Sequence, residues 1–442
     1  MTVGLRSPWA LAALGACLGG DCLAQAQVEY FGLLAPQFGA VRSDFTLAPL
    51  SPIPFPAYDN PSAVGRFFGR LDVKPFYEFG DGRVGLDTGI FSNLNTAYDR
   101  RRGIVPFDYV NTNLTRIRPE TPLGFDRLQL FHEGVLGRFE AGWGNGVSDR
   151  LAVRAPTSWG LGSVAGDYPY FVDKPVDIGF VSVTALGSAN TSPRVAYYTP
   201  PILGVVAGVT YQPDTRSTGF DLRYGDRELG PLGRRANTDQ PLFFEGRPVT
   251  PLVAPRLTGN GSFEATTAGF TDVVEAGFRT THVYFGAVTV QTSLGAITGT
   301  AVQSPLLTRF NDLASFQAGI LVGYEGWSLG GGFVHAGDSG YTKDAHFRQR
   351  KSQYSAHAAL QYEWENWTFG AGTLIADDAG DPTERSDRQL HVYSAGLRHY
   401  LSPELDVGAE VNMIRALSAD YGDYHVYQGL VQLRYRFGGV VR

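Results

Sequence analysis

The chain has 442 residues and a formal charge of −6, and 55 of its residues are glycine. Charged residues make up 18% and aromatic residues 13%, which makes the chain too apolar to be disordered and too glycine-rich for a helical bundle. Beyond the N-terminal segment, no apolar stretch reaches the length of about 18 residues that a spanning helix needs, and the negative charge argues against a nucleic-acid partner.

The first 26 residues resemble a secretory signal that is cleaved from the mature protein. Residues 9–18 form a short apolar core, and residues 24–26 (AQA) place small side chains before the cleavage point. A lipoprotein cleavage box at residues 14–17 (LGAC) is the alternative. Both cysteines fall within this segment, so residues 27–442 are expected to hold no disulfide and no thiolate metal site.

The rest of the chain alternates apolar and polar residues. Between residues 405 and 413, one set is Leu405, Val407, Ala409, Val411 and Met413, and the other is Asp406, Gly408, Glu410 and Asn412. A repeat of two is the side-chain period of a β-strand. One face is apolar and the other carries charges or glycine, so the two faces are expected to meet different solvents.

Sixteen segments of this kind are predicted as strands. In chain order they cover residues 28–41, 65–78, 82–91, 125–134, 137–145, 193–201, 204–213, 271–283, 286–302, 313–324, 327–336, 351–363, 366–376, 389–401, 404–415 and 425–438. The connections alternate between tight turns, such as Glu325-Gly326, and long loops. The long loops are 42–64, 92–124, 146–192, 214–270, 303–312, 337–350, 377–388 and 416–424.

These features favour a membrane barrel over a soluble sandwich, which would also alternate. Aromatic residues cluster near strand ends, as at membrane interfaces, and an even number of antiparallel strands can close so that every backbone group is paired in lipid. The prediction is therefore an all-β fold, a transmembrane antiparallel β-barrel of sixteen strands with both termini on the periplasmic side.

Three segments carry a family resemblance. Residues 137–143 (GRFEAGW), followed by 148–151 (SDRL), resemble the passage from strand to loop in the general porins of Gram-negative bacteria. Residues 192–200 (SPRVAYYTP) and 204–213 are similar to the two strands after the porin constriction loop, and the alphaproteobacterial branch is the most similar. One departure is the C-terminus: porins usually end on an aromatic residue, whereas five residues follow Phe437 here.

The resemblance implies a homotrimer of water-filled barrels in the outer membrane, in contact with lipid and lipopolysaccharide. It implies passive diffusion of small hydrophilic solutes and ions, a second loop (92–124) that latches onto the neighbouring protomer, and a third long loop that folds inward.

The third long loop, residues 146–192, is predicted to narrow the barrel as a constriction loop. Its acidic residues are Asp149, Asp167, Asp173 and Asp177, and the basic residues expected on the facing strands are Arg66, Arg70, Lys74, Arg127 and Arg138. Acids and bases facing each other across a narrow pore create a transverse field that filters ions. The alternative is a loop that lies over the rim of the barrel.

No catalytic residue and no resident cofactor are predicted. Residues 337–340 (GDSG) match a serine-protease string but lie in a predicted loop, and the eight histidines lack the spacing of a zinc site. An acidic loop with Asp377, Asp378 and Asp381 offers oxygen ligands for a calcium ion, although a solvated loop is the alternative. An outer-membrane hydrolase and a surface receptor or adhesin that uses loop 214–270 remain alternative functions.

Overall fold

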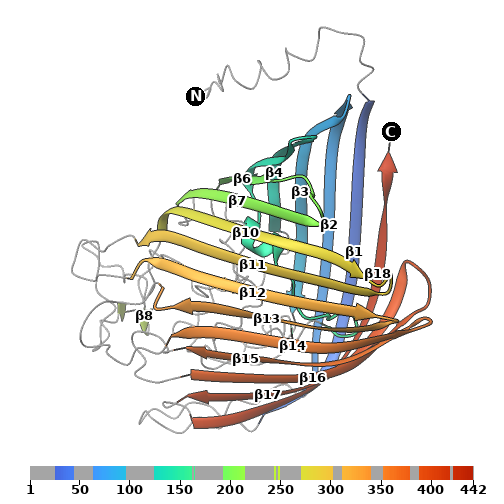
Figure 1. Cartoon of the computed structure of the whole chain (residues 1–442). Helices are drawn as coiled ribbons and strands as arrows, with labels where there is room; N and C mark the ends of the chain where they lie inside the picture. The colour runs from blue at the N-terminus through green and yellow to red at the C-terminus, as the bar shows by residue number, and fades with distance from the viewer. Residues whose placement is uncertain are drawn as a thin grey trace.

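The computed structural model describes residues 25–43, 63–95, 124–161, 164, 193–214, 243–244, 247–248, 270–301, 311–339, 352–378, 388–418 and 422–441. Within these residues sixteen antiparallel strands form a closed barrel in which β1 pairs with β18. Figure 1 shows the strands side by side around the barrel, with the end of β18 beside the start of β1. The predicted fold class is confirmed.

The barrel strands lie within four residues of their predicted ends. They are β1 (Gln25–Ser43), β2 (Ala63–Phe79), β3 (Gly82–Asn95), β4 (Gly124–Gly134), β5 (Gly137–Trp143), β6 (Arg194–Tyr198), β7 (Val205–Asp214), β10 (Phe270–Tyr284), β11 (Val288–Ala301), β12 (Leu313–Tyr324), β13 (Trp327–Gly337), β14 (Gln353–Trp364), β15 (Trp367–Asp378), β16 (Arg388–Tyr400), β17 (Leu405–Ser418) and β18 (Gly422–Val441). Two short strands, β8 (Phe243–Phe244) and β9 (Arg247–Pro248), form a separate pair. None of the helices in the described part of the chain is long and apolar enough to cross a membrane.

Tight turns join consecutive strands at one end of the barrel. In the turn between β12 and β13, Glu325 and Gly326 have φ angles of 44° and 83°. A two-residue hairpin with both φ angles positive matches the natural twist of paired strands, and glycine adopts this region without strain. The Glu325-Gly326 turn is therefore confirmed.

The two faces of the wall differ as the alternation predicts. On β17, Val411 is 61% exposed whereas its neighbour Glu410 is only 2% exposed. At the turn end, the rings of Trp327 and Tyr362 lie 4.4 Å apart, and those of Trp367 and His399 lie 4.2 Å apart. Amphipathic rings of this kind are enriched at membrane interfaces, so the outward face is apolar with an aromatic border.

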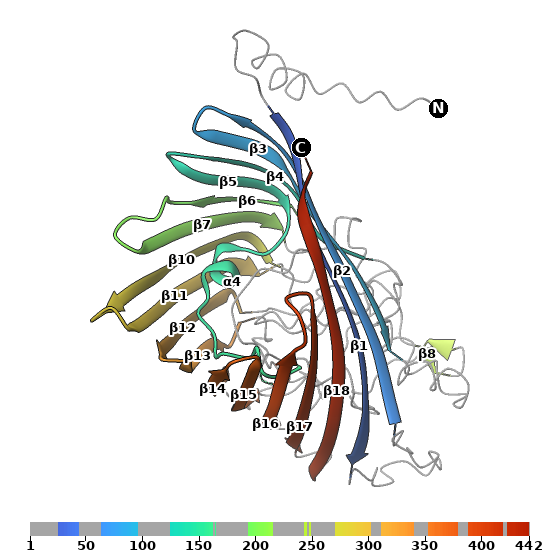
Figure 2. The ribbon, with the colours of Figure 1, turned by 90° about the vertical axis from the view of Figure 1, so that its right-hand side faces the viewer.

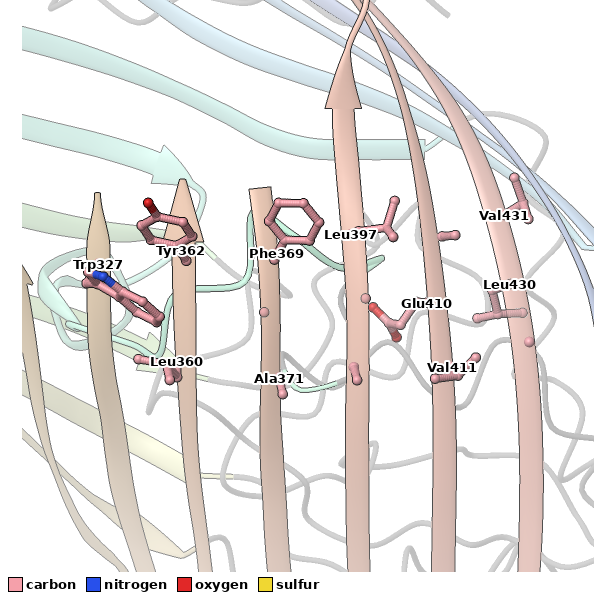
Figure 3. A pocket seen from close by; sticks show the side chains of 15 residues that line it. Trp327, Leu360, Tyr362, Phe369, Ala371, Leu397, Glu410, Val411, Leu430 and Val431 are labelled. Atoms are coloured by element: carbon pink, nitrogen blue, oxygen red, sulfur yellow. The ribbon is translucent and has the colours of Figure 1, made fainter. Parts of the chain in front are cut away.

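The outward face carries an apolar hollow of about 790 Å³ over β13–β18 (Figure 3). Bulky side chains such as Phe369 and Leu397 border it, and small residues such as Ala395, Ala409 and Gly429 line it. The outer surface is therefore not smooth in this region.

The residues after Phe437 continue the last strand. Gly438 pairs with Phe31 and Val441 pairs with Val28, so β18 extends past its final aromatic residue along β1. A Cβ atom at Gly32 would overlap the ring of Phe437, which shows that this ring covers the glycine. The C-terminal departure from the porin pattern is thus a longer final strand with its aromatic residue retained inside it.

Candidate functional site

The segment after β5 turns into the barrel. It begins with the short helix α4 (Val147–Leu151), which Figure 2 shows inside the ring of strands. The Val147 amide donates to the Thr210 hydroxyl on β7 (3.0 Å), and the Ser148 amide donates to the Glu275 carboxylate on β10 (3.2 Å). These contacts hold α4 against the inner wall.

The same segment then follows the inner wall across further strands. The Val153 amide donates to the Ser293 hydroxyl on β11 (2.8 Å), and the Ser158 hydroxyl donates to the Gln361 side chain on β14 (2.6 Å). The Leu161 amide donates to the Glu410 carboxylate on β17. The described part of the predicted constriction loop, residues 146–161 and 164, therefore lies inside the barrel. This placement excludes the alternative of a loop over the rim for these residues.

Glycines on the wall make room for this segment. A Cβ atom at Gly370 on β15 would overlap the indole ring of Trp159, and one at Gly319 on β12 would overlap the carbonyl of Val153. Trp159 is only 1% exposed, so it fills the space that these small residues leave. Glycine in a strand commonly marks such a close approach of another backbone, and Gly319 and Gly370 serve this purpose here.

Arg398 on β16 fixes the far end of the segment. Its buried guanidinium donates to the carbonyl oxygens of Ser158 (2.7 Å) and Gly160 (2.6 Å) and pairs with Asp406. A buried charge is stable only when it is paired and its donors are hydrogen-bonded, and all three nitrogens of Arg398 have acceptors. This residue has no local signal in the sequence, since its two loop acceptors lie 240 and 238 positions away in the chain.

The strands β2–β5 carry the predicted basic wall. Arg70 pairs with Asp72 (2.9 Å), Lys74 with Glu29 (3.4 Å), Arg127 with Asp87 (2.7 Å) and Arg138 with Glu133 (2.9 Å). Four of the five predicted bases are therefore brought together. The fifth, Arg66, lies on β2, and its side chain is outside the described residues.

The acidic partners of this wall are residues that the prediction left out. They are Glu29, Asp72, Asp87, Glu133 and Glu140. The signal for them was present, because Asp72 and Glu140 alternate in phase with Arg70 and Arg138. Each of the four described bases therefore has a carboxylate partner on β1–β5, and the wall is a mixed network of ion pairs.

The loop joins this network through Arg150. Its guanidinium pairs with Glu140 and lies 5.7 Å from the centre of the Tyr198 ring. Burial alone would lower the pKa of Arg150, but the Tyr198 hydroxyl and the Glu140 carboxylate outweigh it and raise that pKa above its ordinary value. Arg150 is therefore a permanent positive charge between the loop and the wall.

Among the predicted loop acids, the described one is Asp149. Its carboxylate pairs with Arg154 and accepts a hydrogen bond from the Asn145 amide nitrogen (2.7 Å), so it is held within its own loop. Asp167, Asp173 and Asp177 lie outside the described residues.

A family model described as Gram-negative porin matches residues 63–417. The chain belongs to the Gram-negative porin family. The porin is an outer-membrane channel for the passive diffusion of small hydrophilic solutes. No curated protein matches its sequence significantly.

Several solved porin-like structures are similar to this porin. OmpF of Salmonella typhi in complex with daunomycin is 10% identical and has a TM-score of 0.49, with 93% of this chain and 97% of that chain covered. The trimer form of OmpT, an outer membrane protein of Vibrio cholerae, is also 10% identical, with a TM-score of 0.49 and coverage of 93% and 99%. The outer membrane channel DcaP of Acinetobacter baumannii is 12% identical, with a TM-score of 0.48 and coverage of 94% and 97%.

The structure describes residues of two further sequence motifs, the GDSG string and the predicted calcium loop. The Ser339 hydroxyl of the GDSG string accepts a hydrogen bond from the Ala314 amide (3.0 Å) and contacts the Ser315 hydroxyl (3.2 Å), so it ties a loop to β12. Asp377 of the predicted calcium loop is buried and accepts a hydrogen bond from Gln389 (3.3 Å). Within the described ranges no three His, Cys, Asp or Glu side chains are grouped to hold a metal. Asp378 ends β15 and Asp381 lies outside those ranges, so the calcium site stays a prediction.

Proposed function

We propose that solutes cross the porin between the loop segment 146–164 and the charged wall of β2–β5. Water and small ions would pass through the space that this segment leaves open, without catalysis and without a resident cofactor. The passage is selective for hydrophilic solutes because charged side chains line the wall that faces the loop.

One observation carries this proposal. The loop segment is hydrogen-bonded to the inner wall at β7, β10, β11, β14 and β17, which are spread around much of the barrel. A segment held at that many points narrows the lumen permanently instead of acting as a mobile cover. The opening must then lie on the side that the segment does not cover, where β2–β5 present their ion pairs.

The remaining loop acids extend the proposal. Asp167, Asp173 and Asp177 would face Arg70, Lys74, Arg127 and Arg138 across the opening, creating a transverse field. Such a field orients polar solutes and filters ions by charge.

We also infer a homotrimer surrounded by lipid and lipopolysaccharide. The apolar outward face and its aromatic border support the lipid contact, and the apolar hollow over β13–β18 has the character of a surface for acyl chains (Figure 3). The trimer form of the Vibrio cholerae protein is a precedent for the assembly.

Conductance in a planar bilayer tests the function and the assembly together. The purified protein should insert as units that close in three equal steps. On a gel it should migrate as an SDS-resistant oligomer until heated, since the closed barrel shields its backbone hydrogen bonds. Insertion without ion-conducting steps would contradict the channel, and a single closing step with monomer migration before heating would contradict the trimer.

A further inference from the structure

A second group of charged side chains lies inside the barrel, on β16–β18. Asp406 is fully buried and pairs with three guanidiniums: Arg398, Arg434 at 2.9 Å and Arg436 at 3.0 Å. Arg434 and Arg436 alternate with the outward-facing Leu433 and Tyr435, so both point into the lumen. We refer to these four charged residues as the arginine cluster.

The charges of the arginine cluster do not balance. Three arginines and one aspartate leave a local charge of 3 − 1 = +2. Arg398 is 1% exposed and its donors are taken up by the loop carbonyls, Asp406 and Gln432. The surplus charge therefore resides on Arg434 and Arg436.

Neighbouring acids do not neutralise this surplus by direct contact. Glu410, further along β17, accepts the Leu161 amide, and the Glu404 side chain accepts the Ser402 hydroxyl in the turn. Arg434 and Arg436 make their ion pairs with Asp406 alone among the described residues.

The two arginines still have free donors that reach the lumen. Arg434 uses its Nε atom on Asp406 and Arg436 uses one terminal nitrogen, so both terminal nitrogens of Arg434 and one of Arg436 have no ion-pair partner among the described residues. Their side chains are 21% and 29% exposed, so a solute in the channel can reach them. A guanidinium presents paired donors that match the two oxygens of a carboxylate or phosphate.

We propose that Arg434 and Arg436 form a binding site for small oxyanions within the channel. This inference rests on the proposed function and names a solute class for it. The oxyanion replaces the missing second carboxylate of the cluster. Because Arg398 joins the cluster to loop residues Ser158 and Gly160, the site lies beside the constriction.

The test uses single channels of the full protein in about 0.1 M KCl, where screening lengths are about 10 Å. Potassium acetate or inorganic phosphate is added stepwise at neutral pH. Both should reduce the chloride current saturably in the wild type. In R434Q/R436Q the half-blocking concentration should rise by about tenfold or more, because the variant loses both positive charges and their charge-assisted hydrogen bonds to the anion. Block by acetate alone would assign the site to carboxylates, and block by phosphate alone would assign it to phosphates.

The matched control is R42Q/R415Q, which removes two exposed arginines on β1 and β17 and leaves the cluster unchanged. Acetate and phosphate should block the current of this control at the same concentrations as in the wild type. The single variants R434Q and R436Q, with smaller shifts, serve if the double variant does not assemble into heat-modifiable oligomers. Wild-type current insensitive to both anions, or equal block in R434Q/R436Q, would overturn the site. Absence of any conducting steps in the wild type would instead overturn the channel itself.

Discussion

The wall of β2–β5 and the arginine cluster of β16–β18 use the same residue types in opposite ways. On the wall, acids and bases alternate, and Arg127 lies between Asp72 and Asp87. In the cluster, three arginines share the buried Asp406. The number of arginines in a lumen therefore does not determine the electric field there, because the carboxylates beside them cancel part of their charge.

The two regions also differ in how they contact the loop. The wall meets the loop through Arg150, whose pair with Glu140 is partly exposed on the arginine side. The cluster contacts the loop through Arg398, which is fully buried and donates hydrogen bonds to loop carbonyls. Stability is therefore expected to depend on the cluster, and ion selectivity on both regions.

The largest expected effect is on stability. Arg398→Met removes a buried partner of Asp406 and the donors to Ser158 and Gly160, which should cost about 3–5 kcal/mol. Arg434→Met removes a partly exposed partner of the same Asp406 and leaves Arg398 and Arg436 paired with it, so this variant should cost less than Arg398→Met. The temperature at which the oligomer dissociates in SDS measures both. Equal dissociation temperatures for the two variants would contradict the role of Arg398 as the residue that anchors the loop.

The second effect concerns the path of the loop. Gly370→Leu places a side chain where Trp159 lies and should move the loop away from the wall and into the channel, with strain of about 1–3 kcal/mol. Single-channel conductance should fall. Ala371→Leu is the matched control, because Ala371 is the next residue on β15 and is exposed on the outward face. Conductance that is unchanged by Gly370→Leu would contradict the packing of the loop against this glycine.

A smaller effect is expected from changing the balance of positive and negative charges on the β2–β5 wall. Asp72→Asn together with Asp87→Asn removes the acids that Arg70 and Arg127 contact. The ratio of anion to cation permeability should rise by about twofold, equivalent to on the order of 0.4 kcal/mol, since these charges lie in a hydrated lumen. Reversal potentials under a salt gradient provide the measurement, and a shift toward cations would contradict the pairing.

The loop acids should give the smallest shift. Replacing Asp167, Asp173 and Asp177 with asparagine should move the reversal potential toward anions at low salt, while conductance changes little because the side chains are nearly isosteric. The shift should fade at 1 M salt, where the screening length is about 3 Å. An unchanged potential at low salt would place these acids away from the channel.

Sequence alone could predict most of the fold, because alternation, turn chemistry and loop length are local signals. The inward loop followed from its length and from the family resemblance. The arginine cluster could not be predicted, since the contact of Arg398 with Ser158 depends on how the loop crosses the barrel. The paired state of Arg127 depends likewise on strand register, which places Asp87 beside it.

The position of the loop inside the channel can be tested most directly by thiol labelling of single channels. The two cysteines of the chain, Cys17 and Cys22, lie in the predicted cleaved signal (residues 1–26), so an introduced cysteine is expected to be the specific probe in the mature protein. Arg154→Cys on the loop and Leu397→Cys on the outward face place a cysteine at a partly exposed position on each side of the barrel wall. A charged, membrane-impermeant thiol reagent should reduce the current of Arg154→Cys channels in discrete steps and leave Leu397→Cys channels unchanged. Labelling of Arg154→Cys without any change in current would contradict a constriction loop inside the channel.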